Sequence, residues 1–236
     1  MLNFTKVKPP ENATAVIMLA DGTVIWGKGI GAETQTVGEI CFNTSMTGYQ
    51  EIVTDPSYAG QIITFTFPHI GNTGANSEDL ETTTPAARGL IIRQDITGPS
   101  NWRSMQNFND WLKGHNLPGI CGVDTRALTR HIRDNGAPNG VICHSPDKKF
   151  DLDALHKTAS EWAGLENADL AAEVSCTQTY QWDEMTWDIE KGYEPVQKPK
   201  HHVVAIDYGA KRNILRCLAA TGCKVTVVPA NSSAED

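Results

Sequence analysis

Cys121 has a setting that could expose a nucleophile. It lies in Gly119-Ile120-Cys121-Gly122, a pattern typical of a sharp turn between a strand and a helix. A reactive thiolate also needs a base within reach, and the sequence offers only His115 and His131 as neighbours of unknown position. The alternative is a buried structural cysteine, and it is the stronger interpretation because free cysteine packs as a small apolar side chain.

Other residues near the end of the chain could bind ions. The adjacent pair His201-His202 suggests a metal site, but neighbouring residues on a strand point to opposite faces, so residues at the entry to a domain are the better interpretation. Gly209 follows an apolar run, as in a phosphate loop, but no complete phosphate-binding motif surrounds it. Lys211 and Arg212 could hold an anion at a helix start or could simply be solvated.

The segment Phe42–Tyr58 is rich in small hydroxyl side chains and turn formers. Asp55-Pro56 favours a type I turn, which places Ser57 at a loop apex. There its hydroxyl and amide could meet a polar ligand. The alternative is a turn in which the Asp and Ser side chains bond only to their own backbone.

Residues 1–150 are predicted to form one mixed β/α domain. An Asp21-Gly22 hairpin joins the first two predicted strands, and alternating apolar residues predict a strand buried on one side over 61–67. The predicted strands are Ala15–Leu19, Thr23–Ile30, Val37–Asn43, Gln61–Phe67, Gly89–Arg93 and Gly140–His144, and the predicted helices are Asn107–His115 and Asp124–Asn135.

The rest of the chain divides into a connector and a second unit. Residues 151–200 hold 11 acidic and 4 basic side chains; apolar spacing predicts a helix over 151–163, and the aperiodic stretch Tyr180–Lys200 indicates a connection between domains. In 201–236, the run Val203–Ile206 predicts a strand covered on both faces. A turn at Asp207–Ala210, a helix over Asn213–Ala220 and a strand at Lys224–Pro229 would complete one βαβ unit.

The final residues, Asn231–Asp236, contain Ser-x-x-Glu, a pattern that begins helices. A single βαβ unit cannot close a core, and an α/β domain usually needs further strands. We therefore expect this sequence to be the N-terminal portion of a longer protein.

Composition excludes several classes of protein. The 236 residues carry a net charge of −8, which argues against a nucleic-acid partner because phosphate binding depends on clustered Lys and Arg. The apolar run at 15–20 is too short for a membrane span or a secretory signal. Six scattered cysteines without a C-x-x-C pattern predict neither a zinc ribbon nor a disulfide scaffold, and favour a cytoplasmic location.

Three ordered blocks resemble a known family. They are FNTSMTGYQEIVTDPSYAGQIITFTFPHIGNTGAN (Phe42–Asn76), GVDTRALTRHIRDNGAPNGVI (Gly122–Ile142) and HVVAIDYGAKRNILRCLAATGCKVTVVPANSSAED (His202–Asp236). Together they are similar to the small, glutamine-hydrolysing chain of carbamoyl-phosphate synthase. The resemblance implies an α/β protein with a small-chain N-terminal swivelling β/β/α domain, followed by the first βαβ unit of a flavodoxin-like class I glutamine amidotransferase domain. That division agrees with the boundary near residue 200.

The resemblance also implies a reaction and a partner. In this family a cysteine attacks the side-chain amide of glutamine, a histidine acts as base and a glutamate orients it. The ammonia released passes through a channel to the large chain, with which the small chain forms a heterodimer or a higher oligomer. ATP and Mg are used there to make carbamoyl phosphate for arginine and pyrimidine synthesis. No cofactor or metal is expected in the present chain.

Only one substrate contact of the family falls inside this sequence. Ser57, in Asp55-Pro56-Ser57-Tyr58, matches the glutamine-binding serine, whereas the nucleophile, base and orienting acid are expected beyond Asp236. Cys121 does not match the nucleophile. Ser45, Met46 and Thr47 are candidates for the domain interface or the start of the ammonia path. The 236 residues alone are expected to be inactive, and the alternative function is a non-catalytic module that only docks on the large chain. An independent nucleotide-binding protein is disfavoured by the missing phosphate loop.

Overall fold

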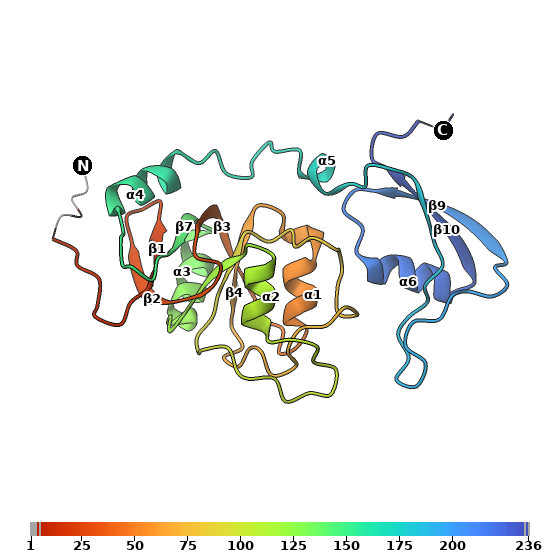
Figure 1. Cartoon of the computed structure of the whole chain (residues 1–236). Helices are drawn as coiled ribbons and strands as arrows, with labels where there is room; N and C mark the ends of the chain where they lie inside the picture. Colours follow the sequence, from red (N-terminus) through yellow and green to blue (C-terminus); the bar gives the residue numbers. More distant parts are fainter. Residues whose placement is uncertain (1–3, 5, 234, 236) are drawn as a thin grey trace.

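The N-terminal region is a closed seven-stranded barrel. The computed structural model describes residues 4, 6–233 and 235. Around the barrel the strand order is β1-β2-β6-β5-β4-β3-β7, and the four strands β3, β4, β5 and β6 run parallel to one another (Figure 1). The barrel strands are β1 (Ala15–Leu19), β2 (Val24–Gly31), β3 (Gln35–Asn43), β4 (Gln61–Phe65), β5 (Gly89–Ile91), β6 (Pro118–Cys121) and β7 (Asn139–His144).

One apolar cluster fills the barrel interior, to which strands around the ring contribute. Ile17, Ile40, Ile62, Ile91 and Ile142 are each fully buried there. Because alternate residues of a strand point to opposite faces, the intervening residues face outward and need a second cover. That cover comes from the helices.

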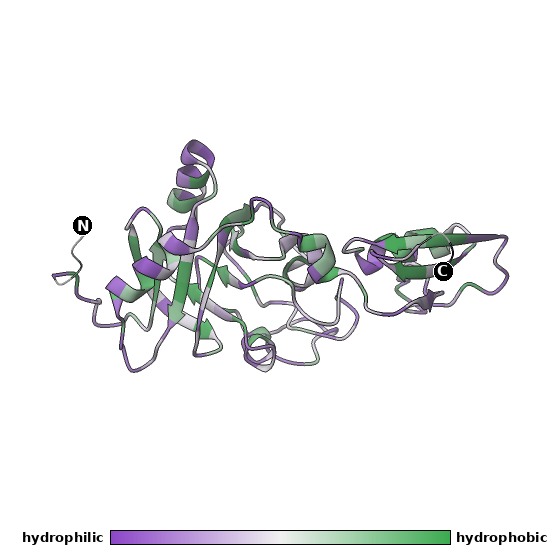
Figure 2. Cartoon of the chain, turned by 90° about the horizontal axis from the view of Figure 1, so that it is seen from above, coloured by the Kyte–Doolittle hydropathy of each residue, from purple (hydrophilic) through white to green (hydrophobic). Residues whose placement is uncertain are grey.

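Helices pack on the outside and at one end of the barrel. The helices around it are α1 (Tyr49–Thr54), η1 (Pro56–Tyr58, one 3-10 turn), α2 (Phe108–Gly114), α3 (Thr125–Asn135) and α4 (Leu152–Glu161). Helices α1 and α2 bury aromatic side chains against β4 and β5, α4 covers β1 and β7, and α3 inserts Leu128 and Ile132 into the interior cluster. Figure 2 shows apolar residues concentrated in these strands and polar residues in the connecting loops.

The C-terminal unit lies beside the barrel (Figures 1 and 2). Its sheet has the order β8-β10-β9, with β9 and β10 parallel and β8 antiparallel to β10. Its elements are α5 (Leu170–Val174), β8 (Tyr180–Trp182), β9 (His201–Asp207), α6 (Arg212–Ala220) and β10 (Cys223–Pro229), of which α5 lies in the connection. Leu215 of α6 packs on Val225 and Val227 to form the small core of this unit.

The predicted elements are largely confirmed. The strands and helices predicted for residues 1–150, the helix over 151–163 and the β9-α6-β10 unit are all present. β4 and β5 end two residues earlier than predicted, because their ladders stop at Phe65 and Ile91. In the described part of the chain, no helix is long and apolar enough to cross a membrane.

Three predictions need correction or cannot be compared. Val203–Ile206 was expected to be covered on both faces, but Val204 is 59% and Ile206 49% exposed, since α6 covers only one face of the sheet. The segment Tyr180–Lys200 is not purely a connection, because β8 adds a strand to that sheet. The helix predicted to begin in Asn231–Asp236 involves residues 234 and 236, which lie outside the described residues.

Candidate functional site

Ser57 lies on a short turn that follows α1. The Asp55 side chain accepts a hydrogen bond from the Ser57 backbone N–H at 2.9 Å, and Pro56 occupies the first position of the turn, where no N–H is needed. Ser57 itself is exposed. The turn predicted from Asp55-Pro56 is therefore present, but it engages the Ser57 amide, which leaves the hydroxyl as the group that can meet a ligand.

The same turn meets the C-terminal unit. Lys211 Nζ lies 2.6 Å from Asp55 Oδ2, and this hydrogen-bonded ion pair raises the pKa of Lys211. A side chain at Gly209 would contact Pro56, with its Cβ 3.5 Å from Pro56 Cβ, and Gly209 also has a positive φ of 91°. Ser57 thus adjoins the junction between the barrel and the C-terminal unit.

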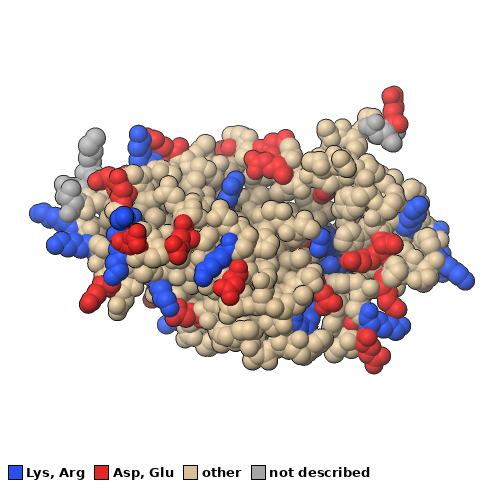
Figure 3. All heavy atoms as spheres, viewed as in Figure 1, with Lys and Arg blue, Asp and Glu red and all other residues tan. Residues whose placement is uncertain are grey.

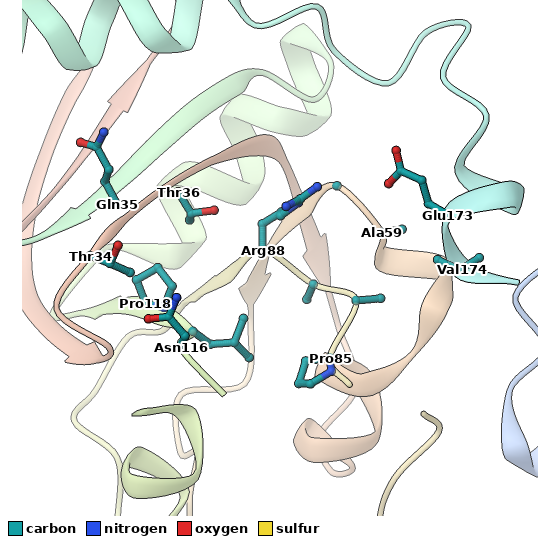
Figure 4. Close-up of a pocket in the computed structure, with 14 residues that line it drawn as sticks. Thr34, Gln35, Thr36, Ala59, Pro85, Arg88, Asn116, Pro118, Glu173 and Val174 are labelled. Atoms are coloured by element: carbon teal, nitrogen blue, oxygen red, sulfur yellow. The ribbon is translucent and has the colours of Figure 1, made fainter. Parts of the chain in front are cut away.

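Two cavities open at this junction. A cleft of about 760 Å³ is lined by Pro56, by Asp207 and Arg212 of the C-terminal unit, and by the threonine-rich segments 82–84 and 177–179. A neighbouring cavity of about 360 Å³ lies where β3 and β6 begin. Figure 4 shows Arg88 extending toward the side of that cavity where Glu173 and Val174 lie. The smaller cavity is mainly polar, the larger cleft is lined about equally by polar and apolar surface, and the two share Glu173 and Val174.

The Ser45–Thr47 segment is an exposed loop before α1. Asn43 Oδ1 accepts a hydrogen bond from the Ser45 N–H at 2.8 Å, and Met46 is 72% exposed. Thr47 lines a pocket of about 250 Å³ together with Glu51 and Arg103. The structure therefore separates the three candidates, because only Thr47 lines this pocket.

Sequence reasoning missed Glu51 and Arg103. Burial raises the pKa of Glu51 to about 7, with Asp79 adding to the effect. Arg103 donates to Asp79 at 2.6 Å and to Glu78 at 3.1 Å, and its guanidinium lies 4.6 Å from the Trp187 ring centre. The apolar spacing of Tyr49, Ile52 and Val53 after Gly48 could have indicated α1, but nothing in the sequence shows that Arg103 lines the same pocket.

Cys121 is a buried structural cysteine. Its thiol lies 2.7 Å from Asp95 Oδ1, and burial raises the pKa of Cys121 to about 12. The turn after β6 is present, with Gly122 at a φ of 81°. His115 bonds to the Trp111 carbonyl and His131 lies near Asp21, so neither histidine is paired with the thiol. The stronger interpretation from the sequence agrees with this arrangement.

The other ion-binding candidates have local partners. Asp207 Oδ1 accepts hydrogen bonds from the N–H groups of Gly209 and Ala210, so these amides are not free for a phosphate. His202 Nε2 lies 2.7 Å from Thr226 Oγ1. Within the described ranges no group of three or more His, Cys, Asp or Glu residues could hold a metal ion.

Comparison with known proteins identifies the family. The family model described as "Carbamoyl-phosphate synthase small chain, CPSase domain" matches residues 17–142. The chain is 58% identical over 228 residues to the carbamoyl phosphate synthase small chain of Ruegeria pomeroyi and 57% identical over 232 residues to that of Bradyrhizobium diazoefficiens, covering 97% of this chain and 59% of each relative. The chain therefore belongs to the carbamoyl-phosphate synthase small chain family.

The matches cover only part of the length of each relative. The small chain of Rhizobium meliloti is 55% identical over 232 residues, which cover 96% of this chain and 58% of the relative. The chain thus spans a little under three-fifths of the length of the curated relatives it matches. Among solved structures, an aminopeptidase from Aneurinibacillus sp. strain AM-1 aligns over 94% of this chain and 49% of its own at 9% identity, and its TM-score of 0.33 carries no argument about the fold.

Proposed function

We propose that this chain supplies the N-terminal part of the glutamine site in a glutamine-hydrolysing carbamoyl-phosphate synthase. Ser57 carries the proposal: its hydroxyl is exposed, its backbone is held by Asp55, and Asp55 is tied to Lys211 of the C-terminal unit. A substrate bound between the two regions would meet a hydroxyl whose backbone is already ordered. Such preorganisation reduces the entropy lost on binding.

The proposed reaction releases ammonia from the glutamine side chain. A cysteine nucleophile expected beyond Asp236 forms a glutamyl thioester and displaces ammonia, and water then hydrolyses the thioester to glutamate. The ammonia passes to the large chain, where ATP-activated bicarbonate captures it and a second ATP completes carbamoyl phosphate. Cys121 takes no part, because its thiol is buried and its pKa is raised to about 12.

A Ser57→Ala substitution tests the site. In the native small chain assembled with the large chain, we expect the Michaelis constant for glutamine to rise about tenfold, the value of one lost hydrogen bond to a bound substrate. Synthesis from added ammonia should be unchanged. Ser100→Ala is the matched control, since Ser100 is another exposed serine outside the cleft. Unchanged glutamine kinetics in Ser57→Ala would remove the assignment.

We also propose that the barrel corresponds to the family's swivelling domain and that β9-α6-β10 begins its amidotransferase domain. The exposed apolar side chains of Val204 and Ile206 support this, since they suit a sheet with a second cover. That cover would come from the part of the relatives that this chain does not span. Hydrogen exchange tests this. The backbone amides of the residues equivalent to Val204 and Ile206 should exchange more slowly in a full-length relative than in residues 1–236 alone.

Thr47 is proposed to line the start of the ammonia path, because it faces the small polar pocket beside α1. A Thr47→Phe substitution would fill part of that pocket. We expect it to uncouple glutamine hydrolysis from carbamoyl phosphate formation, so that more glutamate forms per carbamoyl phosphate. Thr158→Phe on the exposed face of α4 is the control. Unchanged coupling in Thr47→Phe would count against the path.

The docking module remains the second candidate function, because residues 1–236 contain one proposed substrate contact and none of the proposed catalytic residues. We expect residues 1–236 alone to bind the large chain and to hydrolyse no glutamine. An assay of glutaminase activity on the native protein, with and without the large chain, separates the two functions. Activity that depends on the large chain supports the amidotransferase, and binding without activity in the native protein supports the docking module.

A further inference from the structure

A groove of about 680 Å³ lies where the four parallel strands of the barrel end. Thr44 directly follows β3, Thr66 directly follows β4, Arg93 lies two residues after β5, and Thr125 opens α3 after β6. Carboxyl ends of neighbouring parallel strands are a common place for ligand sites in α/β sheets, because loops from several strands converge there. This groove shares no lining residue with the cleft beside Ser57.

The charged side chains of the groove are all arginines. Arg126, Arg130 and Arg133 follow one another at spacings of four and three residues, so they lie along one face of α3, and Arg93 faces them from the end of β5. No Asp or Glu lines the groove. This concentration of positive charge is notable in a chain whose net charge is −8.

Two of these arginines form no ion pair among the described residues, although Arg130 adds to the effect of Arg133 in lowering the pKa of Asp134. Arg133 is paired with Asp134 at 2.8 Å and Arg93 lies 3.8 Å from Asp124, but in the part of the chain that the structure describes no ion pair involves Arg126 or Arg130. Like charges one turn apart repel each other along a helix. An anion between the arginines would offset that repulsion.

Hydroxyl groups complete the donor set. Thr44, Thr66, Thr125 and Thr129 line the groove, of which Thr129 already donates its hydroxyl hydrogen to the Thr125 carbonyl at 2.7 Å.

We propose that this groove binds a small phosphorylated anion through Arg126 and Arg130. Guanidinium groups bind phosphate oxygens in pairs, and hydroxyls donate to the remaining oxygens. An acidic protein surface is the less suitable occupant, because the groove is lined by Thr, Arg and Pro68 and offers no aromatic or large aliphatic side chain for the apolar core that protein interfaces usually have.

Calorimetric titration of the native protein with pyrophosphate, at low ionic strength and without metal ions, tests this proposal. We expect saturable binding with one site, weakened about tenfold or more by Arg130→Gln and less by Arg130→Lys, which keeps the charge but not the paired donors. Arg88→Gln is the matched control, because Arg88 is an exposed arginine that lines a different cavity.

Arg130 is exposed, so thermal unfolding of each variant should match that of the native protein. The proposal is overturned by an absence of saturable binding, or by equal weakening in Arg88→Gln, which would indicate general charge attraction. It is also overturned if a poly-glutamate peptide binds more tightly than pyrophosphate, since that result would assign the groove to an acidic protein partner. Each of these outcomes is independent of the glutamine kinetics of Ser57→Ala.

Discussion

β1 and β9 have similar sequences but different surroundings. Ala15–Leu19 and Val203–Ile206 are both uninterrupted apolar runs, yet all five residues of β1 are buried, whereas Val204 and Ile206 are about half exposed. In β1, one set of residues fills the barrel interior and the other set lies beneath α4. In β9, only the face toward α6 is covered.

The comparison shows what an apolar run in the sequence predicts. The run indicates a strand that can be covered on both faces, but it does not indicate which other parts of the chain cover them. A closed barrel provides the interior cover from its own strands, so one outer helix is enough to complete the burial of β1. An open three-stranded sheet needs a separate layer on each side. The barrel is therefore the region whose core is complete within the described residues.

Core truncation gives the largest difference between the two regions. Ile62→Ala should lower the free energy of unfolding by about 3 kcal/mol, because Ile62 is fully buried and the barrel cannot collapse around the cavity. Val204→Ala should cost less than about 0.5 kcal/mol, as at an ordinary surface position. Urea unfolding followed by circular dichroism measures both. Equal losses would show that the exposed face of β9 is buried in solution.

Local sequence patterns predicted most of the barrel because they act over short distances. The Asp21-Gly22 turn, the apolar alternation in β4 and the capping of α3 by Asp124 all concern neighbouring residues. Helix α1 was missed because it has only six residues and follows a segment rich in turn formers. β8 was missed because a three-residue strand is too short to establish a period, and only its pairing with β10 defines it.

The candidate sites divide in the same way. Ser57 could be proposed from the sequence because Asp55, Pro56 and Ser57 form one local turn and match a family motif. The arginine groove could not be predicted in this way, because its residues follow four different strands. They are spread along the sequence from Thr44 to Arg133. The pocket that Glu51 and Arg103 both line depends on the loop after β5 in the same way. Prediction of such sites requires the strand order of the barrel.

Glu51 offers a second test of how well the outer layer of the barrel is buried. The expected effect is smaller than that of Ile62→Ala. Burial raises its pKa to about 7 in the folded protein from 4.5, so the unfolded chain loses this proton at lower pH than the folded protein does. The stability associated with the protonated group is present below pH 4.5 and is lost as the pH rises through 7. Glu51→Gln should therefore stabilise the protein by about 2 kcal/mol at pH 8 and by almost nothing at pH 4.

Urea unfolding at the two pH values measures this effect. Asp79, Glu81 and Arg103 are the charged groups that act on Glu51, and Arg103 opposes the effect of the two acids. Glu190→Gln, at an exposed position of the connector, is the control and should change stability little at either pH. If Glu51→Gln were neutral at pH 8, the Glu51 carboxylate would have to be solvated, and the outer layer of the barrel would be as open as the C-terminal sheet.

The smallest expected effect concerns the link between the two regions. Lys211→Met removes the ion pair with Asp55 and should cost about 1 kcal/mol or less at pH 7, because the Lys211 side chain is 39% exposed. The pair raises the pKa of Lys211 above 10.5, so its contribution is complete below that value and disappears as the pH rises through the higher folded pKa. The difference between native protein and variant should vanish there. Lys224→Met, an exposed lysine on β10, is the control. A loss for Lys211→Met no larger than the control's would mean that the barrel and the C-terminal unit do not depend on this contact, and that Ser57 is positioned by its own turn alone.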